Sequence, residues 1–200
     1  MSAADASVAA TPVKVLTVCT HNRTRSVMMA AMLEAMLGDR LGARGVIVRS
    51  SGFGPVGIPA IDDAVDAMDR RGLDVSTHRS SETTQRLVDG ADVILTAERD
   101  HVVKIAALSP AAFRRAMTLP EFLQRAPSAE LPDGGQTACT WAEALTADRA
   151  AGEYLRADVP EIADPTGSAR RAFEAAVVAL EQQCNEAAAW LASVSVPAST

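Results

Sequence analysis

One cysteine, one arginine and one serine stand at a spacing that suits chemistry on a bound oxyanion. Cys19 is followed after five residues by Arg25 and then by Ser26, within the stretch CTHNRTRS. The planar fork of an arginine can bind two oxygens of a phosphoryl group, and a serine hydroxyl can donate a hydrogen bond to a thiolate. The spacing therefore predicts that Cys19 is a nucleophile in phosphoryl transfer and that Arg25 is its charge clamp.

The flanking residues predict that this stretch is a loop between a buried strand and a helix. Residues 13–18 read VKVLTV, a short β-rich apolar run, and residues 27–41 are rich in strong helix formers. The backbone N–H groups of such a loop point inward, and the dipole of the following helix adds partial positive charge. A lone cysteine after a buried strand is more often a small core side chain, so this context carries the prediction.

Strands and helices are expected to alternate along the chain. We expect strands at 13–18, 46–49, 91–96 and 116–119, and helices at 27–41, 61–71, 82–88, 100–108, 141–145 and 168–193. This order predicts an α/β fold, a single domain with a four-stranded parallel sheet flanked by helices on both faces. In such sheets the functional site lies at the carboxyl ends of the strands, where Cys19 is expected.

The expected domain covers residues 13–194. A flexible N-terminal tail at 1–12 precedes it, and a short C-terminal tail at 195–200 follows it. Residues 125–160 lack clear periodicity, and we interpret them as an insertion within the domain.

Composition excludes several classes of protein. The net charge of -6 argues against general nucleic-acid binding, because the phosphate backbone requires a basic face. No apolar run reaches the length of a membrane span, so no membrane insertion is expected. The cysteines at 19, 139 and 184 show neither a disulfide framework nor metal-ligand spacing, which favours a cytoplasmic protein without metal or cofactor.

Several stretches together resemble the low-molecular-weight protein tyrosine phosphatase family. The loop CTHNRTRS resembles the C-x5-R-[ST] signature of that family, which also lies near the N-terminus. The stretches RSSGFG, RRGLDVSTHRS and ADVILTAERDH resemble later family segments, and IADP at 162–165 resembles its acid loop. The matches follow the order of the family from about residue 13 to residue 192. They imply its fold and its substrate, a protein that contains phosphotyrosine.

The resemblance also implies a role for each matching residue. Cys19 would attack phosphorus and form a phosphocysteine, and Asp164 would act first as general acid and then as general base. The remaining roles fall into three groups: a phosphate-binding loop of Thr20, His21, Asn22, Arg23, Thr24, Arg25 and Ser26; loop support from Asn22, Ser50 and His78; and a pocket wall of Phe53 and Thr166. By contrast, His101 on an expected helix is interpreted as a surface residue.

Four positions depart from the family pattern, and one of them is Thr24, where many members carry a second cysteine. His21 replaces a glycine, Arg23 replaces an apolar pocket residue, and Thr166 replaces the tyrosine or tryptophan that would cover a phosphotyrosine ring. Phe53 is therefore the expected aromatic wall. These departures affect the specificity of the pocket more than its phosphoryl chemistry.

Two other functions fit the same loop. An arsenate reductase would use Cys19 with a resolving thiol. Cys139 and Cys184 are far apart in sequence; Cys139, in the insertion, is the one candidate for that thiol within the chain, and an external thiol could serve instead. A non-catalytic phosphate-binding regulatory module would use the loop to bind phosphate and would hydrolyse nothing. The Asp164-Pro165 pair favours the phosphatase over both.

Overall fold

The computed structural model describes residues 12–42, 45–128 and 137–195. The expected tails at 1–12 and 195–200 lie almost entirely outside these residues. Four strands form one sheet in the order β2-β1-β3-β4, and every neighbouring pair is parallel. The strands are β1 (Val13–Cys19), β2 (Val46–Gly52), β3 (Val93–Thr96) and β4 (Ala116–Thr118). The predicted four-stranded parallel sheet is confirmed.

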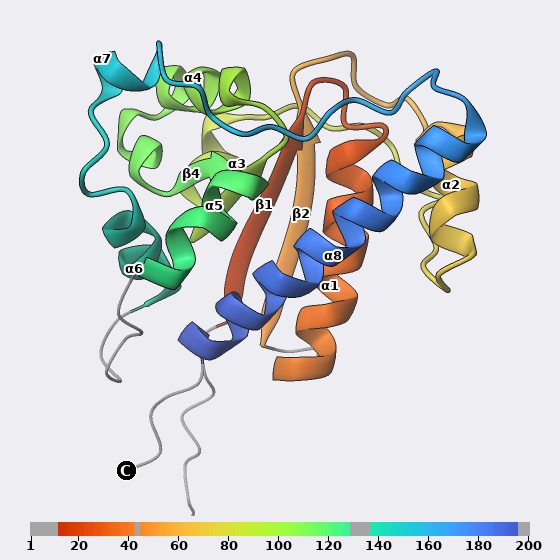
Figure 1. Ribbon diagram of the computed structural model, residues 1–200, viewed down its shortest axis with the longest axis horizontal. Helices are drawn as coiled ribbons and strands as arrows, with labels where there is room; N and C mark the ends of the chain where they lie inside the picture. Colours follow the sequence, from red (N-terminus) through yellow and green to blue (C-terminus); the bar gives the residue numbers. More distant parts are fainter. Residues whose placement is uncertain (1–11, 43–44, 129–136, 196–200) are drawn as a thin grey trace, which may run out of the picture.

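The helices follow the strands and cover both faces of the sheet. They are α1 (Arg25–Leu41), α2 (Asp62–Asp69), α3 (Gln85–Asp89), α4 (Arg99–Leu108), α5 (Leu119–Arg125), α6 (Ala138–Leu145), α7 (Ala151–Tyr154) and α8 (Arg170–Ser195), with 3-10 turns η1 (Pro110–Arg114) and η2 (Ala126–Ser128). Figure 1 shows the long α8 lying across α1 on the near face of the sheet.

The alternation of side chains along β1 divides the core into two clusters. Successive side chains of a strand point to opposite faces. Val13 and Val15 therefore pack in the larger cluster with residues of α1 and α8. Leu16 and Val18 pack in the smaller cluster, which residues of α3 and α4 cover. Helices thus cover both faces, as the fold class predicts, and the carboxyl end of β1 is left free to open into a loop.

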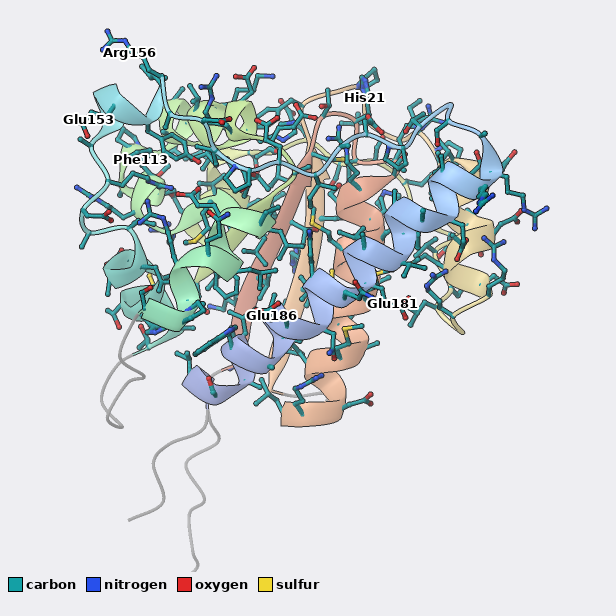
Figure 2. The ribbon with its side chains drawn as sticks, in the orientation of Figure 1. His21, Phe113, Glu153, Arg156, Glu181 and Glu186 are labelled. Atoms are coloured by element: carbon teal, nitrogen blue, oxygen red, sulfur yellow. The ribbon has the colours of Figure 1, made fainter. Side chains whose placement is uncertain are left out.

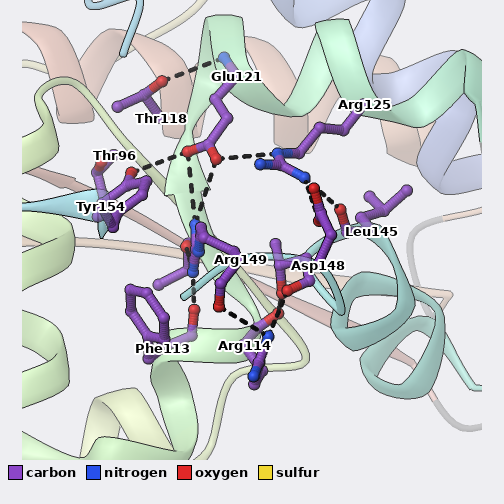
Figure 3. A network of polar contacts seen from close by, with 12 residues as sticks. Thr96, Phe113, Arg114, Thr118, Glu121, Arg125, Leu145, Asp148, Arg149 and Tyr154 are labelled. Atoms are coloured by element: carbon purple, nitrogen blue, oxygen red, sulfur yellow. Dashed lines mark hydrogen bonds and ion pairs between the residues drawn. The ribbon is translucent and has the colours of Figure 1, made fainter. Parts of the chain in front are cut away.

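The segment 125–160 is more ordered than its lack of periodicity indicates. Its described residues contain η2, α6 and α7, and Trp141 of α6 is fully buried edge-on against Phe122 of α5. Glu121 of α5 lies at the centre of a polar network with Arg149 and Tyr154 (Figure 3). The Tyr154 hydroxyl donates to the Glu121 carboxylate at 2.8 Å. The residues of this segment that the structure describes therefore pack on the domain.

Membrane-spanning helices and metal-binding clusters are both absent from the described residues. None of their helices is long and apolar enough to cross a membrane. Within the same residues, no group of three or more histidine, cysteine or acidic side chains is arranged to hold a metal ion.

Candidate active site

The Cys19 thiol lies at the end of β1, where the chain turns into α1. Its side chain is buried, and the residue is only 3% exposed. The Sγ atom lies 3.0 Å from the Ser26 hydroxyl, and the Asn22 side-chain amide donates to that same hydroxyl at 3.0 Å. Because Ser26 accepts from Asn22, its own proton is free to point at Cys19. The Ser26 hydroxyl, in the first turn of α1, is therefore placed to donate a hydrogen bond to the Cys19 sulfur.

The loop holds its shape through the strained residue Asn22. Its φ of 52° lies in the left-handed region, where asparagine is one of the few residues other than glycine to be found readily. The His78 ring donates from Nε2 to the Asn22 carbonyl at 2.8 Å, and the Ser81 backbone N–H donates to the Asn22 side-chain oxygen at 2.9 Å. These bonds bring together two of the three predicted supports, Asn22 and His78.

The third predicted support, Ser50, takes part only through its backbone. Its carbonyl accepts from the Ser81 hydroxyl at 2.9 Å, so Ser81 is the serine that contacts Asn22 directly. The loop also presses on Gly52, where an added Cβ would lie 2.8 Å from the Asn22 nitrogen and 2.9 Å from the Cys19 carbonyl oxygen. Only glycine fits there, so the turn after β2 is as much a part of the loop support as its serines.

Arg25 reaches out of α1 into a cluster of acceptors. It is 2% exposed and donates to Glu98 at 2.5 Å, to the Ile162 carbonyl at 2.9 Å and to Asp164 at 3.0 Å. Glu98 was not predicted from the sequence. A signal for it exists, because this carboxylate follows β3 at the same carboxyl edge of the sheet where Cys19 follows β1.

His101 is not the surface residue that the sequence predicts. It is 1% exposed, at the third position of α4, where Glu98 is the N-cap. The Glu98 N–H donates to Nδ1 of His101 at 3.1 Å, so the proton of the neutral ring is on Nε2, which lies 3.1 Å from the Thr20 hydroxyl. His101 thus connects the first loop residue after Cys19 to the residue that binds Arg25.

Burial is the main reason that His101 is neutral. It lowers the pKa of the ring from 6.5 to about 4. Glu98 raises this pKa, while Arg25 and Lys104 lower it further. The charged form is therefore excluded from this contact near neutral pH.

We expect a His101→Gln variant to lose less stability than the wild type between pH 6.5 and pH 4. The unfolded chain takes up a proton on His101 in this range and the folded protein does not, so stability falls as the pH falls. The cost reaches about 3 kcal/mol at pH 4 and is absent above pH 6.5. Glutamine suits the same position of a capping box, so the helix end is kept. Urea unfolding from pH 4 to pH 7 measures the difference, and equal pH dependence of the two proteins would contradict it.

Asp164 lies on the segment 160–166, here called the strap, which hydrogen bonds hold against the carboxyl edge of the sheet. The Thr118 hydroxyl donates to the Pro160 carbonyl at 2.6 Å, and the Ile162 N–H donates to the Ala97 carbonyl at 2.8 Å. Asp164 accepts the Thr166 N–H at 3.1 Å. Its partial burial would raise the pKa, but the bonds from Thr166 and the positive charge of Arg25 outweigh this effect, and the pKa of Asp164 lies below its usual range.

These side chains surround one pocket of about 210 Å³ at the carboxyl edge of the sheet. Its lining residues are Cys19, His21, Arg23, Thr24, Arg25, Ile61, Asp164 and Thr166. Figure 2 shows the His21 side chain at this end of the molecule. The structure thus brings Asp164 to the pocket of Cys19 and to Arg25, which lies 139 positions away along the chain.

Of the two residues predicted for the pocket wall, Thr166 lies at the pocket and Phe53 does not. Thr166 lines the pocket, with its hydroxyl 3.2 Å from that of Thr24. Phe53 is not among the lining residues. Its ring stacks on His101 with 6.0 Å between centroids, and Lys104 lies over it. The apolar lining side chain is Ile61, which the sequence analysis placed in a helix without assigning it a role.

The other two cysteines lie away from this pocket. Cys184 is fully buried in α8, and burial raises the pKa of its thiol. Cys139 belongs to α6, which lies toward the opposite end of the sheet (Figure 1). Burial and the nearby Glu143 raise the pKa of the Cys139 thiol. Neither is placed or activated to attack an adduct on Cys19.

Sequence and structure comparisons point to one family of proteins. Residues 14–147, more than half of the chain, match the sequence model described as low molecular weight phosphotyrosine protein phosphatase. EpsP of Ralstonia nicotianae, a probable low molecular weight protein-tyrosine-phosphatase, is 38% identical over 98 residues, which cover 48% of this chain and 63% of that protein. The alignment therefore spans less than two thirds of that relative's length.

Two further matches cover more of their own chains. The low molecular weight protein-tyrosine-phosphatase Etp of Escherichia coli is 31% identical over 120 residues, which cover 60% of this chain and 75% of that protein. The solved structure of the YwlE arginine phosphatase from Geobacillus stearothermophilus has a TM-score of 0.65 at 27% identity. That match covers 89% of this chain and 92% of the other.

Proposed function

Because the chain belongs to the low-molecular-weight phosphotyrosine protein phosphatase family, we propose that it hydrolyses phosphotyrosine and other aryl phosphate monoesters through a phosphocysteine intermediate. One observation carries the proposal: the Cys19 thiol, the Arg25 guanidinium and the Asp164 carboxylate line a single pocket of about 210 Å³. A nucleophile, a clamp for phosphoryl oxygens and a proton donor are the three groups that this two-step reaction requires.

In the proposed first step, the Cys19 thiolate attacks phosphorus. A sulfur–phosphorus bond forms and the bond from phosphorus to the phenolic oxygen breaks. Asp164, in its protonated form, gives its proton to that oxygen, so tyrosine leaves as a neutral phenol. The loop N–H groups and Arg25 bind the three phosphoryl oxygens, whose charge is spread in the transition state.

Arg25 couples substrate binding to the protonation of Asp164. In the structure Arg25 pairs with the Asp164 carboxylate at 3.0 Å, and the pKa of Asp164 is low. A phosphoryl dianion in the loop would compete for the Arg25 guanidinium and bring negative charge beside Asp164. Both changes favour the protonated acid that the first step needs. The Glu98 contact, at 2.5 Å, keeps the Arg25 side chain extended toward the loop during this exchange.

In the proposed second step, water attacks the phosphocysteine. Asp164, now a carboxylate, takes a proton from the water while the sulfur–phosphorus bond breaks. Inorganic phosphate leaves and the Cys19 thiolate is restored. These steps use only side chains and water, so they need no metal or cofactor.

The pocket favours phosphotyrosine over a phosphorylated guanidinium. The YwlE structure is that of an arginine phosphatase, and a phosphoarginine would bring positive charge into a pocket that Arg23 also lines. A phenol brings none, and Ile61 offers it an apolar contact. We therefore propose a phosphotyrosine-containing protein as the substrate, bound by a pocket without an aromatic lid.

The two alternative functions receive less support. A self-contained arsenate reductase needs a second thiol within reach of Cys19, and Cys139 and Cys184 are both remote. Neither of the remaining alternatives requires Asp164 to lie beside Arg25. These alternatives are a reductase that uses an external thiol and a phosphate-binding module without catalysis. We also propose that the catalytic domain spans residues 13–194 and contains an insertion near 125–160. Because the three cysteines are free, we place its action in the cytoplasm.

A panel of substrates tests the proposed function directly. We expect turnover of p-nitrophenyl phosphate and of a phosphotyrosine peptide, and much slower turnover of matched phosphoserine and phosphoarginine peptides. Malachite green detection of released phosphate measures all four. Arsenate with glutathione or thioredoxin, followed by arsenite detection, tests the reductase. If arsenate with a thiol is the only substrate that is turned over, the reductase is supported. If no substrate is turned over, the non-catalytic phosphate-binding module is supported.

A further inference from the structure

One part of the sheet face is left uncovered by the helices. Side chains that pair across β1 and β2 share a face, which puts Lys14 beside Ile47 and Leu16 beside Arg49. This is the face that α3 and α4 cover over β1 and β3, but β2 is the edge strand. Ile47 is 40% exposed, and Lys14 and Arg49 are exposed as well.

A groove of about 230 Å³ lies on this uncovered face. It is bounded by β1, β2 and the end of α3, and no acidic side chain lines it. Its cationic and larger apolar lining residues are Lys14, Arg49 and Arg86, with Leu16, Ile47 and Leu87. The groove thus combines three positive charges with an apolar floor.

The three cations of the groove are unpaired. No side-chain hydrogen bond or ion pair is made by Lys14, Arg49 or Arg86 to any residue that the structure describes. The carboxylate of Asp92, just before β3, accepts the backbone N–H of Lys14 at 2.8 Å and forms no ion pair with the Lys14 side chain. Arg25, Arg71 and Arg125, by contrast, are each held by two carboxylates. In a chain with a net charge of -6, three free cations around one groove form a local positive site.

We propose that this groove docks an acidic, extended segment of the phosphoprotein substrate. The inference rests on the proposed phosphatase function and adds a second contact to it. Alternating acidic and apolar side chains would place carboxylates on the cations and apolar groups on Leu16 and Ile47. The groove begins on the strand that ends at Cys19, and Cys19 follows Leu16 by three positions, about 10 Å of extended chain. A substrate a few residues longer than the phosphotyrosine could therefore occupy both sites.

A polypeptide fits this groove better than a nucleic acid does. Nucleic-acid sites follow the phosphate backbone with a long basic stripe, and a basic domain is usual. Here the basic site is short, has an apolar floor and belongs to an acidic chain.

The decisive variant removes only the groove charges. In one protein Lys14, Arg49 and Arg86 become glutamine. In its matched control the exposed residues Arg40, Arg156 and Arg170 become glutamine, which removes the same charge from other faces. Arg156 lies beyond α7, on the far side of the molecule from α2 (Figure 2). The wild type, the groove variant and the control are each assayed with p-nitrophenyl phosphate and with phosphotyrosine peptides. Each peptide carries an arm, Glu-Leu-Glu-Leu-Glu or the same arm with Gln in place of Glu, on one or the other side of the phosphotyrosine.

We expect the wild type and the control to prefer one acidic-arm peptide over its Gln counterpart by about tenfold in kcat/KM. The groove variant should lose that preference and keep its p-nitrophenyl phosphate activity. Raising the salt concentration should weaken the preference in the wild type. No preference in the wild type, or an equal loss in groove variant and control, would overturn the docking proposal.

Binding without catalysis separates this proposal from the proposed function. Fluorescence anisotropy with the labelled, unphosphorylated acidic arm should show binding to wild type and control but not to the groove variant. That result would support the groove even if no aryl phosphate were hydrolysed. A single-stranded oligonucleotide that displaces the arm more strongly than the unlabelled arm itself would overturn the proposal in favour of nucleic acid.

Discussion

Replacing Cys19 with serine should lower kcat for aryl phosphates by roughly 10⁴-fold or more. A serine hydroxyl remains protonated where a thiolate can form, and the helix N-terminus and the Ser26 hydroxyl cannot make up this difference. The loop bonds of Asn22 to His78 and Ser81 do not involve the sulfur, so the loop should keep its shape. Steady-state assays with p-nitrophenyl phosphate measure the loss.

The same variant should still bind phosphate. Arg25 and the loop N–H groups remain, so the affinity for inorganic phosphate, measured by isothermal titration, should change by less than about tenfold. Cys139→Ser is the matched control, because it removes a thiol of the same chain at the other end of the sheet. A Cys19→Ser protein as active as Cys139→Ser would place the nucleophile elsewhere.

The local part of the site could be predicted from the sequence because its residues are neighbours in the chain. The stretch from Cys19 to Ser26 carries its own strand end, turn and helix start, and Asn22 has the left-handed φ that its residue type permits. The parallel sheet and the helices on both faces follow from the alternation of strands and helices along the chain. The order and spacing of residues along the chain were therefore sufficient to predict the strand–loop–helix unit and the fold class.

The parts that could not be predicted are contacts between distant segments. Glu98, Ser81 and Ile61 reach the loop from three different connections, and only Glu98 has a signal in the sequence, its place just after β3. Phe53 was expected on the pocket because Thr166 replaces the aromatic residue of the family, but the Phe53 ring stacks on the buried His101 instead. Neither the contacts to the loop nor the position of Phe53 can be deduced before the connections are packed together.

The segment 125–160 shows the same limit for polar residues. Arg149 and Tyr154 of this segment nevertheless bind the Glu121 carboxylate of α5 in a buried network (Figure 3). Arg149 also lies between the Phe113 and Tyr154 rings. Hydrophobic periodicity cannot detect a segment that is held by buried polar contacts. This network anchors the chain just before the strap that carries Asp164.

Replacing Asp164 with alanine should have an effect that depends on the leaving group. For phenyl phosphate, whose oxygen needs a proton to leave, kcat should fall by about 10²–10³-fold. For 2,4-dinitrophenyl phosphate, the rapid release of the first equivalent of phenol should fall far less, since that oxygen leaves without help. Breakdown of the phosphocysteine should then become rate-limiting, because the base for water is also lost. Rapid-quench measurements of both substrates separate the steps.

Glu98→Gln provides the control for this experiment. Glu98 is the other carboxylate bound to Arg25, so its loss perturbs the clamp without removing a proposed proton donor. It should slow both substrates by the same factor, whereas Asp164→Ala should slow them unequally. If Asp164→Ala also slowed the two first steps equally, Asp164 would act only through Arg25 and the acid would have to be another group. The two carboxylates differ by less than an ångström in their contact with Arg25, and leaving-group dependence is what distinguishes an acid from a clamp.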